Sequence, residues 1–178
     1  MSTGFEHLHR EHEELRTALE RLRITAEQAD RASADELHAM VVADRRFLVD
    51  ELLPHAAGEA EILYPAIQRV LKSPRATVGM EHDHHHVELL ALEIGGLEEA
   101  LARAAAEGQG RSVDEQLAHD IRRVFYSLWA VIVNHFEKEE RVYAPLLAAA
   151  MNPDEAQRMT DELEASVAAR KAQASSGA

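Results

Sequence analysis

The chain has 178 residues, with 19 Lys and Arg against 32 Asp and Glu, a formal net charge of -13, and no cysteine. This length suits one domain with its own buried core. Without cysteine, disulfides, iron–sulfur clusters and thiolate sites are excluded, so nitrogen and oxygen must hold any metal. The negative charge argues against nucleic acid and anionic membranes as partners. A polar beginning and the lack of a long apolar run predict a soluble, cytoplasmic protein.

The first predicted helix covers residues 5–29. Its apolar residues recur three and four positions apart, which places them on one helix face. His12 falls inside this stripe. We therefore expect an imidazole on the buried face of the helix.

The second predicted helix covers residues 33–71 and opens with the capping-box sequence Ser-Ala-Asp-Glu. His55 and Glu59 replace apolar residues on its buried stripe. Pro54 lacks a backbone donor, so we expect a bend there and no domain boundary.

The third predicted helix begins near Thr77 and ends at the glycines of residues 108–110. Its stripe is predicted to carry His82 and His86. The neighbouring His84 and His85, like His7, His9, His38 and His119, are expected to be solvated or to lie behind the ligands.

The fourth predicted helix follows a second capping-box sequence at residues 112–115 and carries His135 and Glu139 on its stripe. A shorter helix is expected over residues 154–171, followed by a frayed tail. The fold class is therefore all-α: an up-down-up-down four-helix bundle over residues 1–150, with an additional short helix and flexible tail over 151–178.

The two halves of the chain resemble each other. Glu11-His12 matches Glu81-His82, and the HxxxE pair of the second helix matches that of the fourth. Tyr64 and Tyr143 follow the two pairs at similar distances. This half-repeat predicts that two similar helix pairs surround one axis.

Polar side chains on all four buried stripes need a common partner. HxxxE and HxxxH place two side chains one turn apart on one helix face. An unpaired buried imidazole or carboxylate costs roughly 1–3 kcal/mol, and an uncompensated charge costs more. Two cations would satisfy all of them at once. The candidate metal ligands are His12, His55, Glu59, His82, His86, His135 and Glu139.

The runs LHREHEELR, LLPHAAGEAEILYPAI, MEHDHHH and NHFEKEERVYAPLL resemble the ligand-bearing segments of the hemerythrin-like (HHE) family, over about residues 5–148. The resemblance implies two oxo- or hydroxo-bridged iron ions, although these ligands also suit manganese and zinc. It assigns three histidines to one iron, His82, His86 and His135, and two to the other. Glu59 and a second carboxylate would bridge them.

Several points stay open at this level. The second bridge is Glu139 or Glu140, of which Glu139 lies on the stripe. Tyr64 and Tyr143 are packing residues, hydrogen-bond donors to the site, or phenolate ligands. A ferritin-like site built from Glu6-x-x-His9 and Glu81-x-x-His84 is the rival arrangement, but it would leave five histidines buried without a metal.

The resemblance implies a small-molecule ligand, namely dioxygen, nitric oxide or peroxide, bound for sensing, carriage or detoxification. The alternatives are an enzyme that disproportionates peroxide or reduces nitric oxide, and an iron-responsive or iron-buffering module. A redox partner would be needed for some of these roles, and the sequence does not identify one.

Overall fold

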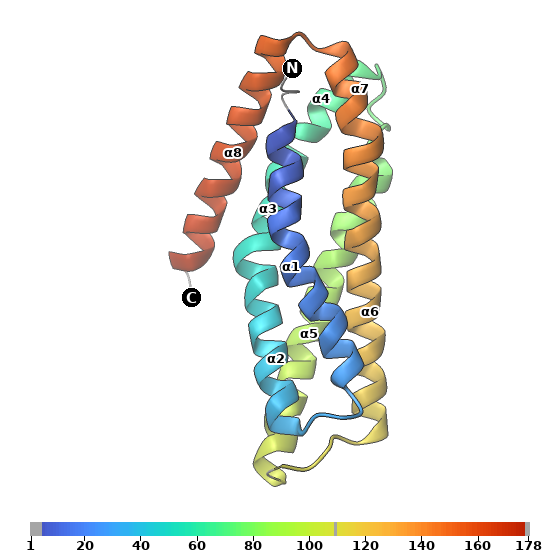
Figure 1. The fold of residues 1–178 in the computed structure, drawn as a ribbon, viewed down its shortest axis with the longest axis vertical. Helices are drawn as coiled ribbons and strands as arrows, with labels where there is room; N and C mark the ends of the chain where they lie inside the picture. The colour runs from blue at the N-terminus through green and yellow to red at the C-terminus, as the bar shows by residue number, and fades with distance from the viewer. Residues whose placement is uncertain (1–4, 109, 177–178) are drawn as a thin grey trace.

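The computed structural model describes residues 5–108 and 110–176, and the regular elements of this part are helices, joined by one isolated bridge between Ser33 and Ser112. Four helical rods form the bundle and a further helix lies outside it (Figure 1). The first rod is α1 (Glu6–Gln28) and the third is α5 (Val78–Glu107). The second rod joins α2 (Ala34–Phe47), η1 (Leu48–Leu52), α3 (Leu53–Glu61) and α4 (Leu63–Val70). The fourth joins α6 (Glu115–Lys138), η2 (Glu139–Tyr143) and α7 (Ala144–Ala150), and the outer helix is α8 (Pro153–Ser176).

Each rod of the bundle contacts its two neighbours. The α1 helix packs against α2 and α6, and α5 packs against the same two helices from the other side. Successive rods therefore run in opposite directions around a common core (Figure 1). The predicted all-α bundle with an additional C-terminal helix is confirmed.

The second and fourth rods each contain one π-helical turn, η1 and η2. The amide of Leu53 donates to the carbonyl of Leu48, and the amide of Ala144 donates to that of Glu139. The second residue after each turn is a proline, Pro54 after η1 and Pro145 after η2. Because a proline ring clashes with the carbonyl four residues earlier and supplies no N–H, the preceding turn widens. The bend predicted at Pro54 takes this form.

Helix ends agree with the sequence at some positions and differ at others. The capping box of Ser33 and Glu36 is present, because each side chain bonds the other residue's backbone amide. The box predicted at residues 112–115 is wrong, since Asp114 is the N-cap and accepts from the amide of Leu117 at 2.8 Å. The last helix continues to Ser176, beyond its predicted end, and residues 177–178 of the predicted tail lie outside the described part.

Two groups of buried apolar residues fill the bundle. One lies around Leu22, Leu48 and Phe125 in the long shared part of the four rods. The other lies around Tyr64 and Leu163, where the start of α1, α4, α7 and α8 meet. The buried polar residues of the chain's ligand motifs lie between these two groups, so apolar packing shields them along the bundle axis.

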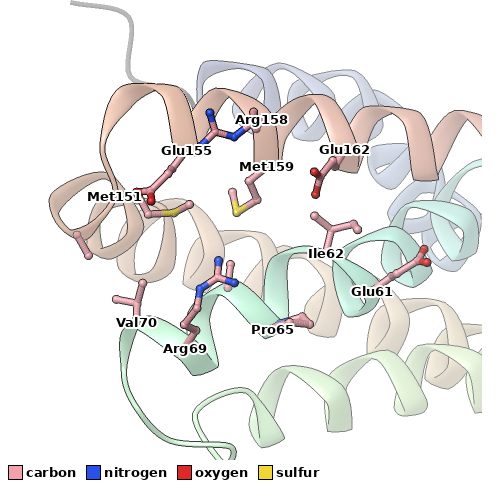
Figure 2. Close-up of a pocket in the computed structure, with 12 residues that line it drawn as sticks. Glu61, Ile62, Pro65, Arg69, Val70, Met151, Glu155, Arg158, Met159 and Glu162 are labelled. Carbon is pink, nitrogen blue, oxygen red and sulfur yellow. The ribbon is translucent and has the colours of Figure 1, made fainter.

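The outer helix α8 packs along α3 and η1. Its closest approach is at Gly58, where an added Cβ would lie 2.6 Å from Cγ2 of Val167. Beyond this contact, a hollow of about 660 Å³ lies between α8 and α4, and Arg69, Met159 and Glu162 are among the residues that line it (Figure 2). Within the described residues, every helix is too short or too polar to cross a membrane.

Candidate metal centre

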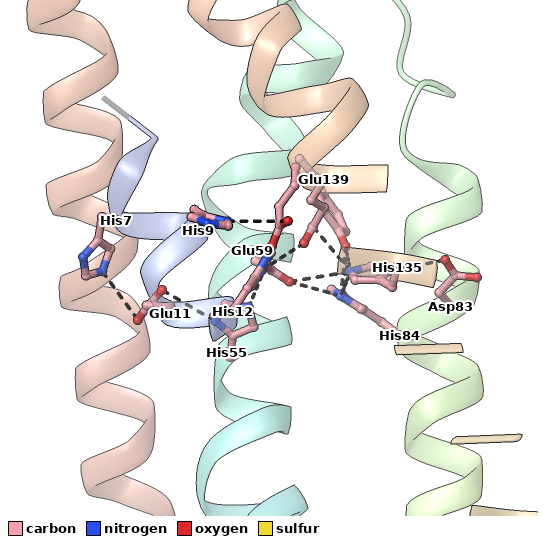
Figure 3. A network of polar contacts seen from close by, with 12 residues as sticks. His7, His9, Glu11, His12, His55, Glu59, Asp83, His84, His135 and Glu139 are labelled. Atoms are coloured by element: carbon pink, nitrogen blue, oxygen red, sulfur yellow. Dashed lines mark hydrogen bonds and ion pairs between the residues drawn. The ribbon is translucent and has the colours of Figure 1, made fainter. Parts of the chain in front are cut away.

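Six polar side chains from all four rods converge in the middle of the bundle (Figure 3). Five of them are buried, with at most 4% of the residue exposed. The sixth, His84, is partly exposed. The six are His12 from α1, His55 and Glu59 from α3, His84 from α5, His135 from α6, and Glu139 at the start of η2.

Within each HxxxE pair the imidazole and the carboxylate meet on one helix face. Nε2 of His55 lies 2.8 Å from Oε1 of Glu59, and Nε2 of His135 lies 3.4 Å from Oε1 of Glu139. One helical turn separates the two members, as the sequence spacing requires. Local helix geometry alone therefore accounts for both pairs.

The other two histidines join these pairs from opposite sides. Nε2 of His12 lies 3.6 Å from Glu59 and 3.4 Å from Glu139. Nε2 of His84 lies 3.3 Å from Oε2 of Glu59 and 3.0 Å from Nε2 of His135. Two overlapping groups result, in which ligand atoms lie within 4.8 Å of one another: His12 with His55 and Glu59, and His84 with His135 and Glu59.

The inward atoms of this cluster fit a metal because they lack other partners. In the described part of the chain, Nε2 of His12, Nε2 of His55 and both carboxylate oxygens of Glu59 and Glu139 are buried without a hydrogen bond. They approach one another closely, but without hydrogen-bond geometry. Buried polar atoms left in this state are costly. A nitrogen and oxygen set of this kind, gathered at one depth, is suited to divalent and trivalent cations.

Carboxylates lie outside three of the four imidazoles and accept a hydrogen bond from two of them. Nδ1 of His12 donates to Glu140 at 2.9 Å, and Nδ1 of His135 donates to Asp83 at 3.3 Å. Nδ1 of His55 lies 3.7 Å from Glu11. An acceptor at Nδ1 leaves Nε2 as the inward lone pair, which is the tautomer that a metal requires.

In the protein without metal, protons balance the buried carboxylates. Burial by itself lowers the pKa of His135, but Glu139, Asp83 and Glu59 outweigh it and raise the pKa to about 12. Burial raises the pKa of Glu59, yet the charge of His55 and contacts from His12 and His135 hold it well below its usual value. For Glu139, burial and the charge of Glu59 raise the pKa. The cluster therefore needs positive charge, whether from protons or from metal ions.

Tyr64 is buried beside the cluster. Its hydroxyl lies 2.9 Å from Nε2 of His84 and 3.4 Å from Nε2 of His135. Burial, followed by the nearby carboxylates, raises its pKa, so the phenol stays protonated. Tyr143 lies elsewhere and donates to the carbonyl of Ala76 at 3.1 Å. Of the two tyrosines considered from the sequence, only Tyr64 is within reach of the site.

The structure does not bring His82 and His86 into the cluster. Both are exposed, and His84, expected to be solvated, occupies the inward position. The reason is which side of α5 faces the core. Met80 and Val87 are buried on that side, and His84 lies on the same side because it is four residues after Met80 and three before Val87. These two apolar neighbours are the sequence signal that would have indicated His84. The resemblance implied three histidines at one ion and two at the other, whereas each of the two groups in the structure contains two histidines.

Glu139 and Glu140 lie on different sides of the cluster. Glu139 is fully buried and faces both His12 and His135. Glu140 lies behind His12, where the guanidinium of Arg16 donates to it at 3.0 Å. The rival ferritin-like arrangement is not formed, since His9 is exposed and Glu81 accepts from Thr77.

A small cavity of about 20 Å³ adjoins the cluster. His55, Glu59, His84 and His135 form one side of it. The remaining lining is apolar and consists of Leu52, Ala56, Val87, Ile132 and Phe136. Phe136 also stacks on His12, with 3.9 Å between the ring centroids, which fixes the orientation of that imidazole. We refer to the small cavity beside the cluster as the inner cavity.

The hemerythrin HHE cation-binding domain family matches residues 3–147 of the chain. The chain therefore belongs to this family, and the suspected resemblance is confirmed. Searches among curated proteins and among solved structures found no match. A histidine and carboxylate cluster suited to metal, in a domain of a cation-binding family, makes this a metal-binding protein.

Proposed function

We propose that the chain binds two iron ions in the cluster. His12 and His55 would hold one ion, His84 and His135 would hold the other, and the carboxylates of Glu59 and Glu139 would be shared. The observation that carries this proposal is the set of buried inward atoms without hydrogen bonds on His12, His55, Glu59 and Glu139.

The arrangement of the two ligand groups supports two ions. They overlap at Glu59, and each brings two imidazoles to it. Glu139 faces one imidazole from each group. Two buried carboxylates with four imidazoles suit a pair of cations better than one, because a single ion would leave buried ligands without a partner. Iron is inferred from the family, and manganese and zinc accept the same donors.

We further propose that a molecule of two or a few atoms binds beside the metals, namely dioxygen, nitric oxide or peroxide. The inner cavity supports this, because a volume of about 20 Å³ admits about one molecule of the size of water. Its apolar lining favours an uncharged gas over an ion. Bound iron would supply an open coordination position and a change of oxidation state.

A catalytic role in peroxide or nitric oxide removal is the second candidate, and Tyr64 favours it. Nitric oxide reduction consumes protons and peroxide disproportionation moves them between two peroxide molecules, and the phenol of Tyr64 stays protonated within 2.9 Å of His84. A tyrosine in this position would deliver or hold a proton beside the site.

The first test is metal analysis of protein purified from iron-replete cells. About two irons per chain are expected, and the double variant His82→Ala, His86→Ala is the matched control that should keep both. Protein that stays metal-free after anaerobic addition of ferrous iron would overturn the proposal.

The second test separates binding from catalysis. The reduced, iron-loaded protein is mixed with nitric oxide or dioxygen and followed by absorption. A stable, reversible adduct supports carriage or sensing, whereas turnover that the Tyr64→Phe variant loses supports the enzyme.

A further inference from the structure

The six side chains of the cluster are not equally shielded from solvent. The side chains of His12, His55, Glu59, His135 and Glu139 are exposed by 5% or less. The side chain of His84 is exposed by 13%. The cluster is therefore closest to solvent at His84, on the side where α5 faces α3.

A hollow of about 320 Å³ lies at this position between α3 and α5. Its α3 wall consists of Leu53 and three small side chains, Ala56, Ala57 and Ala60, and its α5 wall consists of Glu81, His84, His85 and Glu88. We refer to it as the α3–α5 hollow. Since alanine side chains end at Cβ, the two helices leave space here that larger residues would fill.

The α3–α5 hollow and the inner cavity share two lining residues, Ala56 and His84. The imidazole of His84 therefore has the hollow on one side and the inner cavity on the other. A small separation of α3 from α5 would join the two spaces and leave the imidazole of His84 on the metal. Collective motions of helices take place in microseconds to milliseconds.

We infer that the small-molecule ligand reaches the metal pair through the α3–α5 hollow, past Ala56 and His84. This inference rests on the proposed function. It adds a second task for His84, which separates the inner cavity from solvent as well as holding metal. Residues that line the hollow, Ala57 and Ala60, then control the rate of ligand binding without touching the ligand at its site.

Two other hollows come near the cluster and are the rival routes. One, of about 480 Å³, touches His55 and Glu11 but is lined by charged groups such as Arg21 and Lys171. The other, of about 520 Å³, ends at Glu140 and shares no lining residue with the inner cavity. The α3–α5 hollow also has charged groups on its α5 wall, Glu81 and Glu88, but it shares two lining residues with the inner cavity, whereas the hollow at His55 shares one and the hollow at Glu140 shares none.

Three tryptophan substitutions, one in each hollow, test the inference. Ala57→Trp fills the α3–α5 hollow, Ala43→Trp fills the hollow at His55, and Ala148→Trp fills the hollow at Glu140. Nitric oxide is mixed with each reduced, iron-loaded protein in a stopped-flow instrument. We expect Ala57→Trp to slow association and dissociation by about tenfold each, with the Kd and iron content unchanged, because a narrowed route slows both directions equally.

The outcomes are distinguishable. Rates that stay unchanged in Ala57→Trp, or that slow as much in Ala43→Trp or Ala148→Trp, would overturn the inferred route. Ala60→Trp, at an exposed position of the same hollow, is the second variant if Ala57→Trp does not fold. Failure of the wild-type protein to load iron or bind nitric oxide would instead overturn the proposed function.

Discussion

In the first half of the bundle the histidine and carboxylate pair is His55 and Glu59, and in the second half it is His135 and Glu139. Both pairs have the same spacing, both lie near a π-helical turn, and both point inward. The halves differ in what holds the pairs in place. The comparison shows that local helix geometry makes the ligand pairs alike, while the supports come from different contacts.

The difference in support is clearest at the residue three positions after His55 in the first half and after His135 in the second. In the first half this residue is Gly58, and its missing side chain lets α8 pack directly on α3. In the second half it is Lys138, whose ammonium donates to Asp83 at 2.6 Å. Asp83 in turn accepts from His135. Apolar packing therefore supports the first pair, whereas the contacts of Asp83 with Lys138 and His135 support the second.

The first and third rods each contribute one further histidine, but not in equivalent positions. His12 follows the half-repeat, whereas its expected counterpart His82 is exposed and His84 takes its place. The half-repeat is thus kept in the HxxxE pairs and lost in α5.

The largest expected effect tests the shift from His82 to His84. We expect His84→Ala to retain about one metal per chain in place of about two, because one ion loses an imidazole. His82→Ala is the matched control on the same helix and should retain both. Metal analysis after gel filtration measures this. Loss of metal in His82→Ala, with His84→Ala unaffected, would show that α5 turns His82 toward the cluster in solution and not His84.

The outer carboxylates provide the next comparison. Asp83→Asn keeps an oxygen near His135 but removes the charge, and Glu140→Gln does the same behind His12. We expect each to weaken metal binding about 10- to 100-fold. The effect of Asp83→Asn should be confined to the ion held by His84 and His135. Competition with a coloured chelator gives the two affinities, and equal weakening at both ions would contradict separate supports.

Proton release distinguishes the second half of the site. The pKa of about 12 means that His135 carries a proton at neutral pH in the metal-free protein. A bound metal must displace it, so metal affinity should rise with pH by about tenfold per unit for each proton released. Calorimetry in buffers of different ionisation enthalpy counts these protons. Asp83→Asn should lower the pH above which the affinity stops rising, because Asp83 helps to raise the pKa of His135. Binding without proton release would contradict the pairing described.

The smallest expected effect concerns the packing of α8. An added methyl group at Gly58 meets Val167 at 2.6 Å, so Gly58→Ala should destabilise the fold by about 1 kcal/mol after its gain in helix propensity. Gly96→Ala meets nothing within 4 Å and should stabilise it by about 0.5–1 kcal/mol. Urea unfolding of metal-free protein measures both. A stabilising Gly58→Ala would mean that α8 is not held against α3.

Much of the fold and part of the candidate site follow from the sequence alone. The apolar stripes predict four rods and an extra helix, and Ser33 with Glu36 predicts one helix start. Spacing within a helix is a local property, so His55 with Glu59 and His135 with Glu139 are brought together as predicted. The family assignment rests on a match over residues 3–147.

Tertiary structure alone decided the rest. The polar run from Glu81 to His86 contains no apolar residue to fix its inward side, and the flanking Met80 and Val87 indicate His84 once the packing shows that both of them are buried. The position of Glu140 likewise depends on another rod, because Nδ1 of His12 on α1 donates to its carboxylate. Neighbours along the chain cannot determine these choices, because each depends on which side of a helix meets the other three rods.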